Sequence, residues 1–518
     1  MKVIILAGGT HKWLWKALSL KLSKKSGASI NIFVSNNSMY SYYEGHCERY
    51  KKIKLHKLPN IYDKIINSCL DYDVNYKDLK YFEKNYACNI IKDMVFSDRQ
   101  IGSDYYISAP NHAKSKIAKK ANLNSGLNGI KISFELWEKK IQEIKPNLII
   151  LSGGMYGIYN SPLKFIAKKK NIPVRVLTSA RIEDYYYWAT DELGHFTNEL
   201  KEKVKNFKNA NIVSSNDLLP VKRKSDLTDE VISAGFSSTS LGNLIFLIIK
   251  KIRSIVVSFF KNKQKFKQGI SFFTNLKYLF NGVINQKYND FFAIKSFKKN
   301  DLKTKVFFPL QQVPEFTSLN HSWAHDQLNV ILECSLALPV NCKMIVKEHY
   351  FSMNVRNLDF YRFISRLPNV ELAHPSISGK FLAENCQMVI SISSTALYEA
   401  ALFGKPILSF QYFNHISYLP HVYNANSQKD IKKIQKIISK HKSKTVQVKA
   451  VNDAIKMQNT IKKNFFSLKG NLGYIDLNNF KASFKSASKI EKIEGDKLIK
   501  ALSKSKILEH LYKSLENS

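Results

Sequence analysis

Residues 388–408 read MVISISSTALYEAALFGKPIL and carry the pattern of a strand, a helix and a second strand in one short segment. The apolar run 388–392 is typical of a buried strand, and hydroxyl residues follow it directly. The alanine-rich part then predicts a short helix that Gly404 can cap, and Pro406 precedes the second strand. A strand, a helix and a strand in succession predict a parallel sheet with helices on its faces.

The same pattern continues on both sides of this segment. Further strands are predicted at 305–310, 343–347, 369–373 and 407–410, with helical stretches between them. We therefore expect a C-terminal Rossmann-like, doubly wound domain over residues 301–430. The remaining residues, 431–518, are rich in lysine and predicted to be helical.

The N-terminal part of the chain repeats this organisation. Val3–Leu6 reads as a buried strand, a glycine turn follows it, and a second strand is expected at Ile30–Val34 after a helical segment. A later copy begins with a strand at 146–151 that leads into Gly153-Gly154. Residues 1–221 are therefore predicted to form a first Rossmann-like domain.

Between the two domains, residues 222–300 form a basic and aliphatic insertion whose periodicity suits helices with cationic faces. Such helices either pack on the rest of the protein or lie in a bilayer interface that contains anionic lipid. We expect residues 242–267 to hold the protein on an anionic membrane surface. No uninterrupted apolar run of about 18 residues is present, so we do not expect a membrane-spanning helix.

Composition narrows the classes of function. With 44% hydrophobic and 12% aromatic residues among 518, the chain is not an intrinsically disordered protein. The 80 Lys and Arg residues against 41 Asp and Glu give a net charge of +39, which attracts polyanions of any kind. No zinc finger or other nucleic-acid-binding motif is present, so nucleic acid is not an expected partner. The six cysteines have no metal-ligand spacing and are expected to be free thiols.

The hydroxyl residues at the end of the strand 388–392 are the first candidate ligand-binding group. Ser393, Ser394 and Thr395, with the free N–H groups of the helix start, can hold a phosphate. Glu399, one turn into the helix, is then placed to contact a ribose. The alternative is that the hydroxyls are only helix caps and Glu399 a solvated charge.

Two more polar clusters follow strands of the same sheet. Gln311 and Glu315 come after the strand 305–310, and Pro314 fixes the backbone before Glu315, while Lys347 and His349 end the strand 343–347. Lysine offers a point charge, and histidine a donor or proton carrier near neutral pH. Ligands bind at the carboxyl ends of the strands in open α/β sheets, so we expect the three clusters to share one site.

Taken together, these residues resemble the capsule polysaccharide biosynthesis family, which includes the retaining Kdo transferases. The motifs that carry the resemblance are Phe308-Pro309-Leu310-Gln311 with Glu315, Asp326-Gln327, Lys347-Glu348-His349, Ser393-Ser394-Thr395 with Glu399, and Gly404-Lys405-Pro406. They cover about a fifth of the chain. Tyr350 departs from the family pattern, in which a proline follows the histidine.

The resemblance implies a GT-B architecture, with two Rossmann-like domains facing a cleft, and a cytoplasmic glycosyltransferase that builds capsule or lipopolysaccharide. Its donor would be a nucleotide sugar, expected to be a CMP-linked acidic sugar of the Kdo type, bound by Gln311, Lys347, Ser393, Ser394, Thr395 and Glu399. Glu315 would be the catalytic carboxylate and His349 its partner, with either retention or inversion of configuration. Arg181 and Glu183 of the first domain are candidates for binding a glycan or lipid-linked acceptor.

Neither a cofactor nor a metal is expected, because a helix start and Lys347 can offset phosphate charge. Asp71 and Asp73 form an Asp-x-Asp string far from the donor motifs in sequence. Three alternatives stay open: a nucleotide-sugar 2-epimerase, a basic membrane- or nucleic-acid-binding protein without enzymatic activity, and an inactive relative of the transferases. Incubation with a nucleotide sugar and no acceptor distinguishes an epimerase from a transferase, since epimerisation needs no acceptor.

Overall fold

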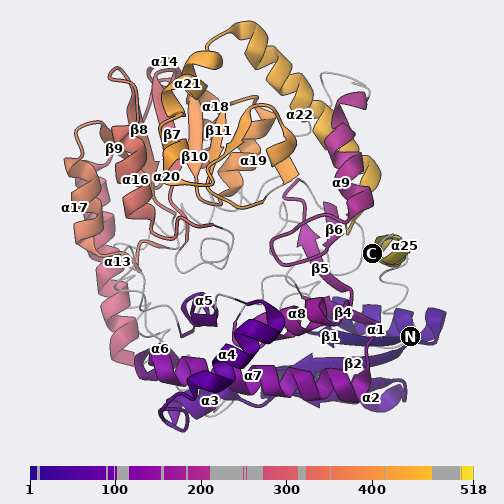
Figure 1. Cartoon of the computed structure of the whole chain (residues 1–518). Coiled ribbons are helices and arrows are strands. Elements are labelled where there is room, and N and C mark those ends of the chain that lie inside the picture. Colours follow the sequence, from indigo (N-terminus) through magenta and orange to yellow (C-terminus); the bar gives the residue numbers. More distant parts are fainter. Residues whose placement is uncertain are drawn as a thin grey trace.

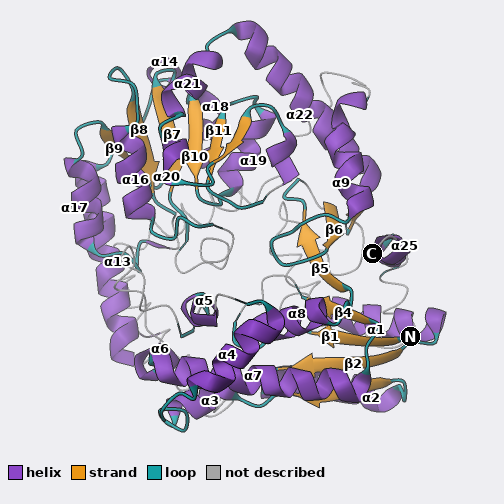
Figure 2. Cartoon of the chain, viewed as in Figure 1, coloured by secondary structure: helices purple, strands orange, loops and turns teal. Residues whose placement is uncertain are grey.

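The computed structural model describes residues 1–8, 12–88, 91–98, 100–101, 116–152, 157–182, 185–210, 249, 253, 272–312, 322–349, 352–413, 415–468, 502 and 505–516. These residues form two α/β domains, each built around its own sheet (Figure 1). In both, helices flank the strands (Figure 2).

The N-terminal sheet has the strand order β13-β6-β5-β4-β1-β2-β3. Strands β1 to β5 pair in parallel, whereas β6 and β13 add an antiparallel edge. The order β3-β2-β1-β4-β5 is that of a Rossmann domain. The strands are β1 (Lys2–Leu6), β2 (Ser29–Val34), β3 (Ile53–Lys57), β4 (Leu148–Leu151), β5 (Val174–Ser179), β6 (Tyr185–Ala189) and β13 (Phe466–Ser467).

Both faces of this sheet are covered, so its central strands are continuous apolar runs, Val3–Leu6 in β1 and Leu148–Leu151 in β4. Along β1, Ile4 and Leu6 belong to one buried cluster and Val3 and Ile5 to another, as the two-residue period of a strand requires. The flanking helices are α1 (Lys12–Ser26), α2 (Asn37–Arg49), α3 (Ile61–Ile66), α4 (Tyr76–Tyr86), α5 (Ile91–Phe96), α6 (Lys116–Lys120), α7 (Leu123–Ile144), α8 (Asn160–Lys169), α9 (Asn198–Lys205) and the 3-10 helix η2 (Asn206–Asn209).

The C-terminal sheet is entirely parallel, with the order β12-β11-β10-β7-β8-β9. The direction of winding reverses between β7 and β10, which is therefore the topological switch point. The strands are β7 (Lys305–Pro309), β8 (Lys343–Lys347), β9 (Val370–Ala373), β10 (Met388–Ser391), β11 (Ile407–Ser409) and β12 (Val422–Asn424). The helices are α14 (Lys299–Leu302), α16 (Gln327–Leu336), α17 (Leu358–Arg366), α18 (Gly379–Asn385), α19 (Thr395–Leu402), η6 (His415–Tyr418), α20 (Gln428–Ile431) and α21 (Ile434–Lys440).

Long helices run along two sides of the molecule. Helix α13 (Phe272–Phe292) leads into the C-terminal domain and packs beside α17, and α22 (Lys444–Asn464) returns from that domain on the opposite side (Figure 1). The last helix, α25 (Ile507–Glu516), lies on the N-terminal sheet, where the Trp188 indole donates to the Ile507 carbonyl at 2.9 Å. Strand β13 and helix α25 belong to residues 431–518, which the sequence predicts to be a helical C-terminal region. In the structure both elements are part of the N-terminal domain.

The domains meet through loops at the carboxyl ends of their strands. Phe413, after β11, lies edge-on against Phe196 of the N-terminal domain with ring centroids 5.4 Å apart. His415 is buried and bonded to the backbone of Ala180, which follows β5. The carboxyl edges of the two sheets therefore border the same region between the domains.

The predicted fold class is confirmed: two Rossmann-like, doubly wound domains form a GT-B-like architecture. All the strands predicted in both domains are present, to within two residues at each end. Most of the basic segment 242–267 and the Gly153-Gly154 turn lie outside the described residues. In the part of the chain that is described, no helix combines the length and the apolar character that crossing a bilayer requires.

Candidate functional site

Two predicted donor-binding residues meet across the switch point of the C-terminal sheet. Gln311 follows β7 by two residues, Ser393 follows β10 by two residues, and Gln311 Nε2 donates to Ser393 Oγ at 2.8 Å. Gln311 is only 4% exposed, and its buried Oε1 accepts no hydrogen bond from any described residue. This oxygen can therefore accept a hydrogen bond from a ligand at the switch point.

Helix α19 begins directly beside this pair. Ser394 is its N-cap, in an extended conformation, and its side chain accepts from the backbone N–H of Ala396 at 3.2 Å. Thr395 is exposed, whereas Glu399 is only 8% exposed on the buried side of the helix. The serine is thus a helix cap, as one alternative holds, but Glu399 is not a solvated surface charge.

The far end of α19 is fixed by Gly404, as the sequence predicts. Its φ of +65° lies in the left-handed region that favours glycine. A Cβ at this position would lie 2.9 Å from the backbone nitrogen of Val451 in α22. Close packing of α22 against this turn therefore requires glycine.

Lys347 and His349 lie at the end of β8, on the other side of β7. Both side chains are half-buried, and Lys347 Nζ lies 3.4 Å from the Glu348 carbonyl oxygen. Because β10, β7 and β8 are neighbours in the sheet, the described candidates for donor binding lie at the ends of three adjacent strands or in the helix that follows β10. The structure thus brings together what the sequence assigns to one site.

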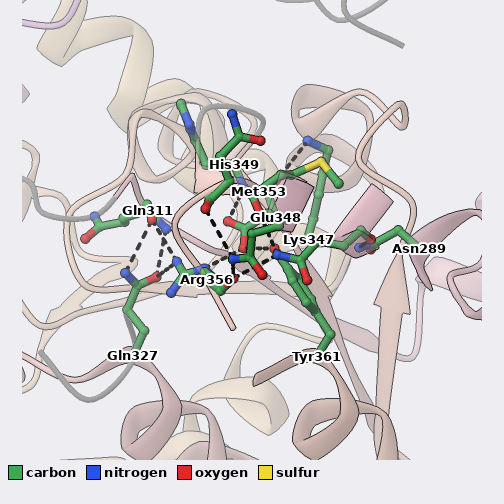
Figure 3. Close-up of polar contacts among 12 residues, drawn as sticks. Asn289, Gln311, Gln327, Lys347, Glu348, His349, Met353, Arg356 and Tyr361 are labelled. Atoms are coloured by element: carbon green, nitrogen blue, oxygen red, sulfur yellow. Dashed lines mark hydrogen bonds and ion pairs between the residues drawn. The ribbon is translucent and has the colours of Figure 1, made fainter. Parts of the chain in front are cut away.

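Glu348, between these two residues, is part of the protein framework (Figure 3). Its fully buried carboxylate accepts hydrogen bonds from Arg356 Nε, from the Tyr361 hydroxyl at 2.8 Å and from the His349 backbone N–H at 2.7 Å. Burial raises the pKa of the Tyr361 hydroxyl well above its usual value, and the adjacent Glu348 carboxylate raises it further. Tyr361 therefore stays a proton donor to Glu348, and Glu348 is not available as a catalytic acid or base.

Arg356 connects this carboxylate to the switch point. Its guanidinium donates to the Gln311 carbonyl oxygen at 2.9 Å and stacks over the Phe360 ring at 4.3 Å. Gln327, at the start of α16, accepts from the Gln311 backbone N–H at 2.8 Å. Both backbone groups of Gln311 are thus held by buried side chains, which fixes where its own side chain points.

Sequence reasoning missed Arg356 and Tyr361. Neither belongs to a strand-end motif, and only the tertiary fold brings them to Glu348. Gln327 was noted through the family resemblance, without a role. The signal available in the sequence was Glu348 at the end of an apolar strand. A carboxylate that is buried there needs a partner of opposite charge.

On the N-terminal side, Arg181 lies at the domain boundary. It follows β5 with a φ of +57° and is exposed. Burial, and to a lesser extent the positive charge of Arg181, lower the pKa of His415 to about 3. Burial also raises the pKa of Tyr398, on α19, to about 12, with Arg181 opposing this shift. Arg181 therefore acts electrostatically on the helix whose N-terminus is the predicted phosphate site.

Two residues of the predicted site, Glu315 and Glu183, lie outside the described part of the chain. The same holds for Tyr350, which stands where the family motif has a proline. Among the described residues, no group of three or more His, Cys, Asp or Glu side chains is arranged to hold a metal ion. Asp71 and Asp73 are exposed, and Asn122 Nδ2 donates to Asp71 Oδ1 at 3.3 Å.

No family model matches this chain, and no curated protein matches it either. Among solved structures it is similar to a UDP-GlcNAc 2-epimerase from Neisseria meningitidis bound to UDP-GlcNAc, with 14% identity, 90% of this chain and 100% of that chain covered, and a TM-score of 0.26. It is also similar to HepE from Anabaena in complex with UDP and glucose, with 11% identity, 94% and 99% covered, and a TM-score of 0.28.

A third similar structure is KpsC, a beta Kdo 2,4 transferase from Thermosulfurimonas dismutans, with 9% identity, 60% of this chain and 79% of that chain covered, and a TM-score of 0.28. At identities and TM-scores this low, the likenesses carry no argument about activity. The function therefore has to be argued from the residues of this chain.

Proposed function

We propose that this chain is a glycosyltransferase that moves a sugar from a nucleotide donor onto a glycan or glycolipid acceptor in bacterial surface polysaccharide synthesis. One observation carries the proposal: Gln311, Lys347 and Ser393 lie at the carboxyl ends of three adjacent parallel strands, and the Gln311–Ser393 hydrogen bond spans the switch point. Switch points are where open α/β sheets bind ligands such as nucleotides.

The donor nucleotide is assigned to the C-terminal domain. Its phosphate would bind at the exposed N-terminus of α19, beside Ser394 and Thr395, where the helix dipole favours negative charge. Lys347 would add a positive charge from β8, so the proposal needs no metal or cofactor. Glu399 is proposed to contact the ribose.

The chemistry follows from the charges that develop during transfer. The anomeric carbon becomes positive and the departing phosphate negative, so the reaction needs an anionic group near the first and donors near the second. We assign the anionic role to Glu315 by its place in the sequence, and the donor role to His349 and Lys347. With retention Glu315 would be the nucleophile, and with inversion the base toward the acceptor hydroxyl.

The donor sugar is proposed to be an acidic sugar of the Kdo type linked to CMP, on the strength of the family resemblance alone. Arg181 and Glu183 are proposed to bind the acceptor. The position of Arg181 at the domain boundary supports a role there, since an acceptor has to reach the donor from the N-terminal domain.

Calorimetric titration of the purified protein with CMP and UDP tests the donor site. Incubation with CMP-Kdo and with UDP-sugars, with and without a glycan acceptor, then tests the reaction. A transferase yields an elongated glycan and only slow hydrolysis of the donor alone. Rapid conversion of a nucleotide sugar to its epimer without acceptor would contradict the proposal and favour the 2-epimerase, and failure to bind any nucleotide would contradict both.

A further inference from the structure

Helix α13 presents an apolar stripe to the outside of the molecule. Phe273, Phe280, Ile284 and Phe291 are 79%, 46%, 50% and 82% exposed. Their spacings of 7, 4 and 7 residues add up to 18, which is five turns of an α-helix, so the four side chains lie along one line of the helix surface. We refer to these four residues as the α13 stripe.

The opposite side of α13 is polar and packs against the donor domain. Asn281 and Asn285 donate to the Arg356 carbonyl oxygen at 2.6 and 2.8 Å, and Asn285 also donates to the Met353 carbonyl at 2.6 Å. Gly282 lets α13 approach closely, since a Cβ there would clash with Asn354. Amides therefore hold the inner side of α13, where Tyr288 also packs against Tyr361, while the four apolar side chains of the α13 stripe face outward.

The exposed charges on α13 and directly after it are mostly positive. Lys277 and Lys287 are exposed on the helix, and Lys295, Lys298 and Lys299 are exposed just after it. The sole acidic residue of the helix, Asp290, contacts His374 of the protein at 3.1 Å. In the sequence, residues 231–289 contain nine Lys or Arg and no Asp or Glu.

We infer that the α13 stripe docks this protein on a bilayer that contains anionic lipid. Exposed aromatic and aliphatic side chains flanked by lysines are the composition of an interfacial membrane helix, in which the apolar side chains enter the headgroup region and the cations contact anionic lipid. A second copy of this chain fits less well, because it would bring the same basic flanks together. The inference does not depend on the proposed function and names a surface distinct from residues 242–267.

Vesicle flotation of the full-length protein tests this inference. We expect binding to phosphatidylcholine vesicles that contain phosphatidylglycerol, weak binding to phosphatidylcholine alone, and weaker binding at high salt. The triple variant Phe273→Ser, Phe280→Ser and Phe291→Ser should lose at least about tenfold in affinity for the anionic vesicles, since apolar burial drives insertion. Leu336→Ser, which removes a residue that is 75% exposed on α16, is the matched control and should bind as the original protein does.

A second variant separates charge from apolar insertion. Lys277→Glu with Lys287→Glu should remove the preference for anionic vesicles while the protein stays folded, as checked by circular dichroism. Equal binding of the triple variant and the original protein would overturn the inference and place membrane contact elsewhere in the chain. Absence of binding to either vesicle, or a change from dimer to monomer in the triple variant without a change in flotation, would overturn it as well.

Discussion

The Gln311 side chain donates a hydrogen bond of 2.8 Å to Ser393 Oγ, and these two residues follow the strands between which the C-terminal sheet reverses its winding. This hydrogen bond spans the switch point, from the end of β7 to the end of β10, and orients the Gln311 Oε1 atom. The Gln311 carbonyl oxygen accepts from Arg356 at 2.9 Å, and the Gln311 backbone N–H donates to Gln327 Oε1 at 2.8 Å. The position of one amide at the proposed donor site is thus fixed by three hydrogen bonds.

Replacing Gln311 with alanine should weaken nucleotide binding. The variant loses a buried hydrogen bond at the donor site, which is worth about 0.5–1.5 kcal/mol and therefore about two- to tenfold in Kd. Titration calorimetry with the best-binding nucleotide measures the effect. Gln312→Ala, at the half-buried neighbouring position, is the control and should bind normally. Equal affinity of the two variants would exclude Gln311 from the donor site.

Glu399→Ala should raise the Kd for the nucleotide at least about tenfold, because a charge-assisted hydrogen bond to the ribose contributes about 1.5–3 kcal/mol. The same calorimetric titration measures it. Glu384→Ala removes an exposed glutamate from the neighbouring helix α18 and serves as the control. A folded Glu399→Ala protein with unchanged affinity would remove the ribose assignment.

Glu348→Gln should destabilise the fold. The substitution leaves the Arg356 guanidinium buried without its counter-charge, and breaking such a pair costs about 3–5 kcal/mol. Urea unfolding followed by tryptophan fluorescence should show a clearly lower midpoint. Asp359→Asn breaks an exposed pair with Arg362 on α17 and should change stability by less than about 1 kcal/mol. Similar midpoints for both variants would show that the buried pair does not stabilise the domain.

Much of the fold could be predicted because strands buried on both faces are continuous apolar runs. Val3–Leu6 and 344–346 are such runs, and 388–392 is interrupted only by Ser391; a glycine turn follows the first, and polar residues follow the other two. The edge strands were missed for the same reason: β3 reads IKLHK, with polar residues at every second position, and β13 has only two residues. Their place in the sheet depends on neighbours that the local sequence does not specify.

The strand-end part of the site could be predicted as well, because parallel strands align their carboxyl ends at one edge. The buried hydrogen bonds and the ion pair that hold these strand ends in place could not be predicted. Arg356 reaches Glu348 and Gln311 only through the fold, and Asn281 and Asn285 bond to its carbonyl from a helix 75 and 71 residues away in sequence. Contacts of this kind leave no periodic pattern in the chain.

Glu315→Gln should reduce turnover at least about a hundredfold, because it keeps the size of the side chain and removes the charge that the reaction needs. Nucleotide affinity should stay normal, since the proposed phosphate and ribose contacts come from the start of α19 and from Lys347 of β8. Steady-state transfer and calorimetry on the same preparation measure both quantities. Near-normal turnover by a folded variant would exclude Glu315 and direct the search to an acid of the N-terminal domain, because Glu348 is committed to Arg356.

His415 should make the domain boundary sensitive to acid. Burial lowers the pKa of its imidazole to about 3 in the folded protein, and the charge of Arg181 acts in the same direction. In the unfolded chain the pKa returns to about 6.5. Between these values the unfolded chain binds a proton that the folded protein does not, so stability falls as the pH falls from about 6.5 toward 3. The slope from this one residue is up to about 1.4 kcal/mol per pH unit.

His415→Gln removes the titrating group and keeps an amide that can bond to the Ala180 backbone. The free energy of unfolding of the variant should therefore decline less steeply than that of the original protein over the acid range, measured by urea unfolding at several pH values. His421, with a pKa lowered to about 4 by burial, is present in both proteins and cancels in the difference. His325→Gln changes an exposed histidine and should leave the slope as it is. Parallel stability curves for His415→Gln and the original protein would mean that His415 is not held neutral by its buried position between the domains.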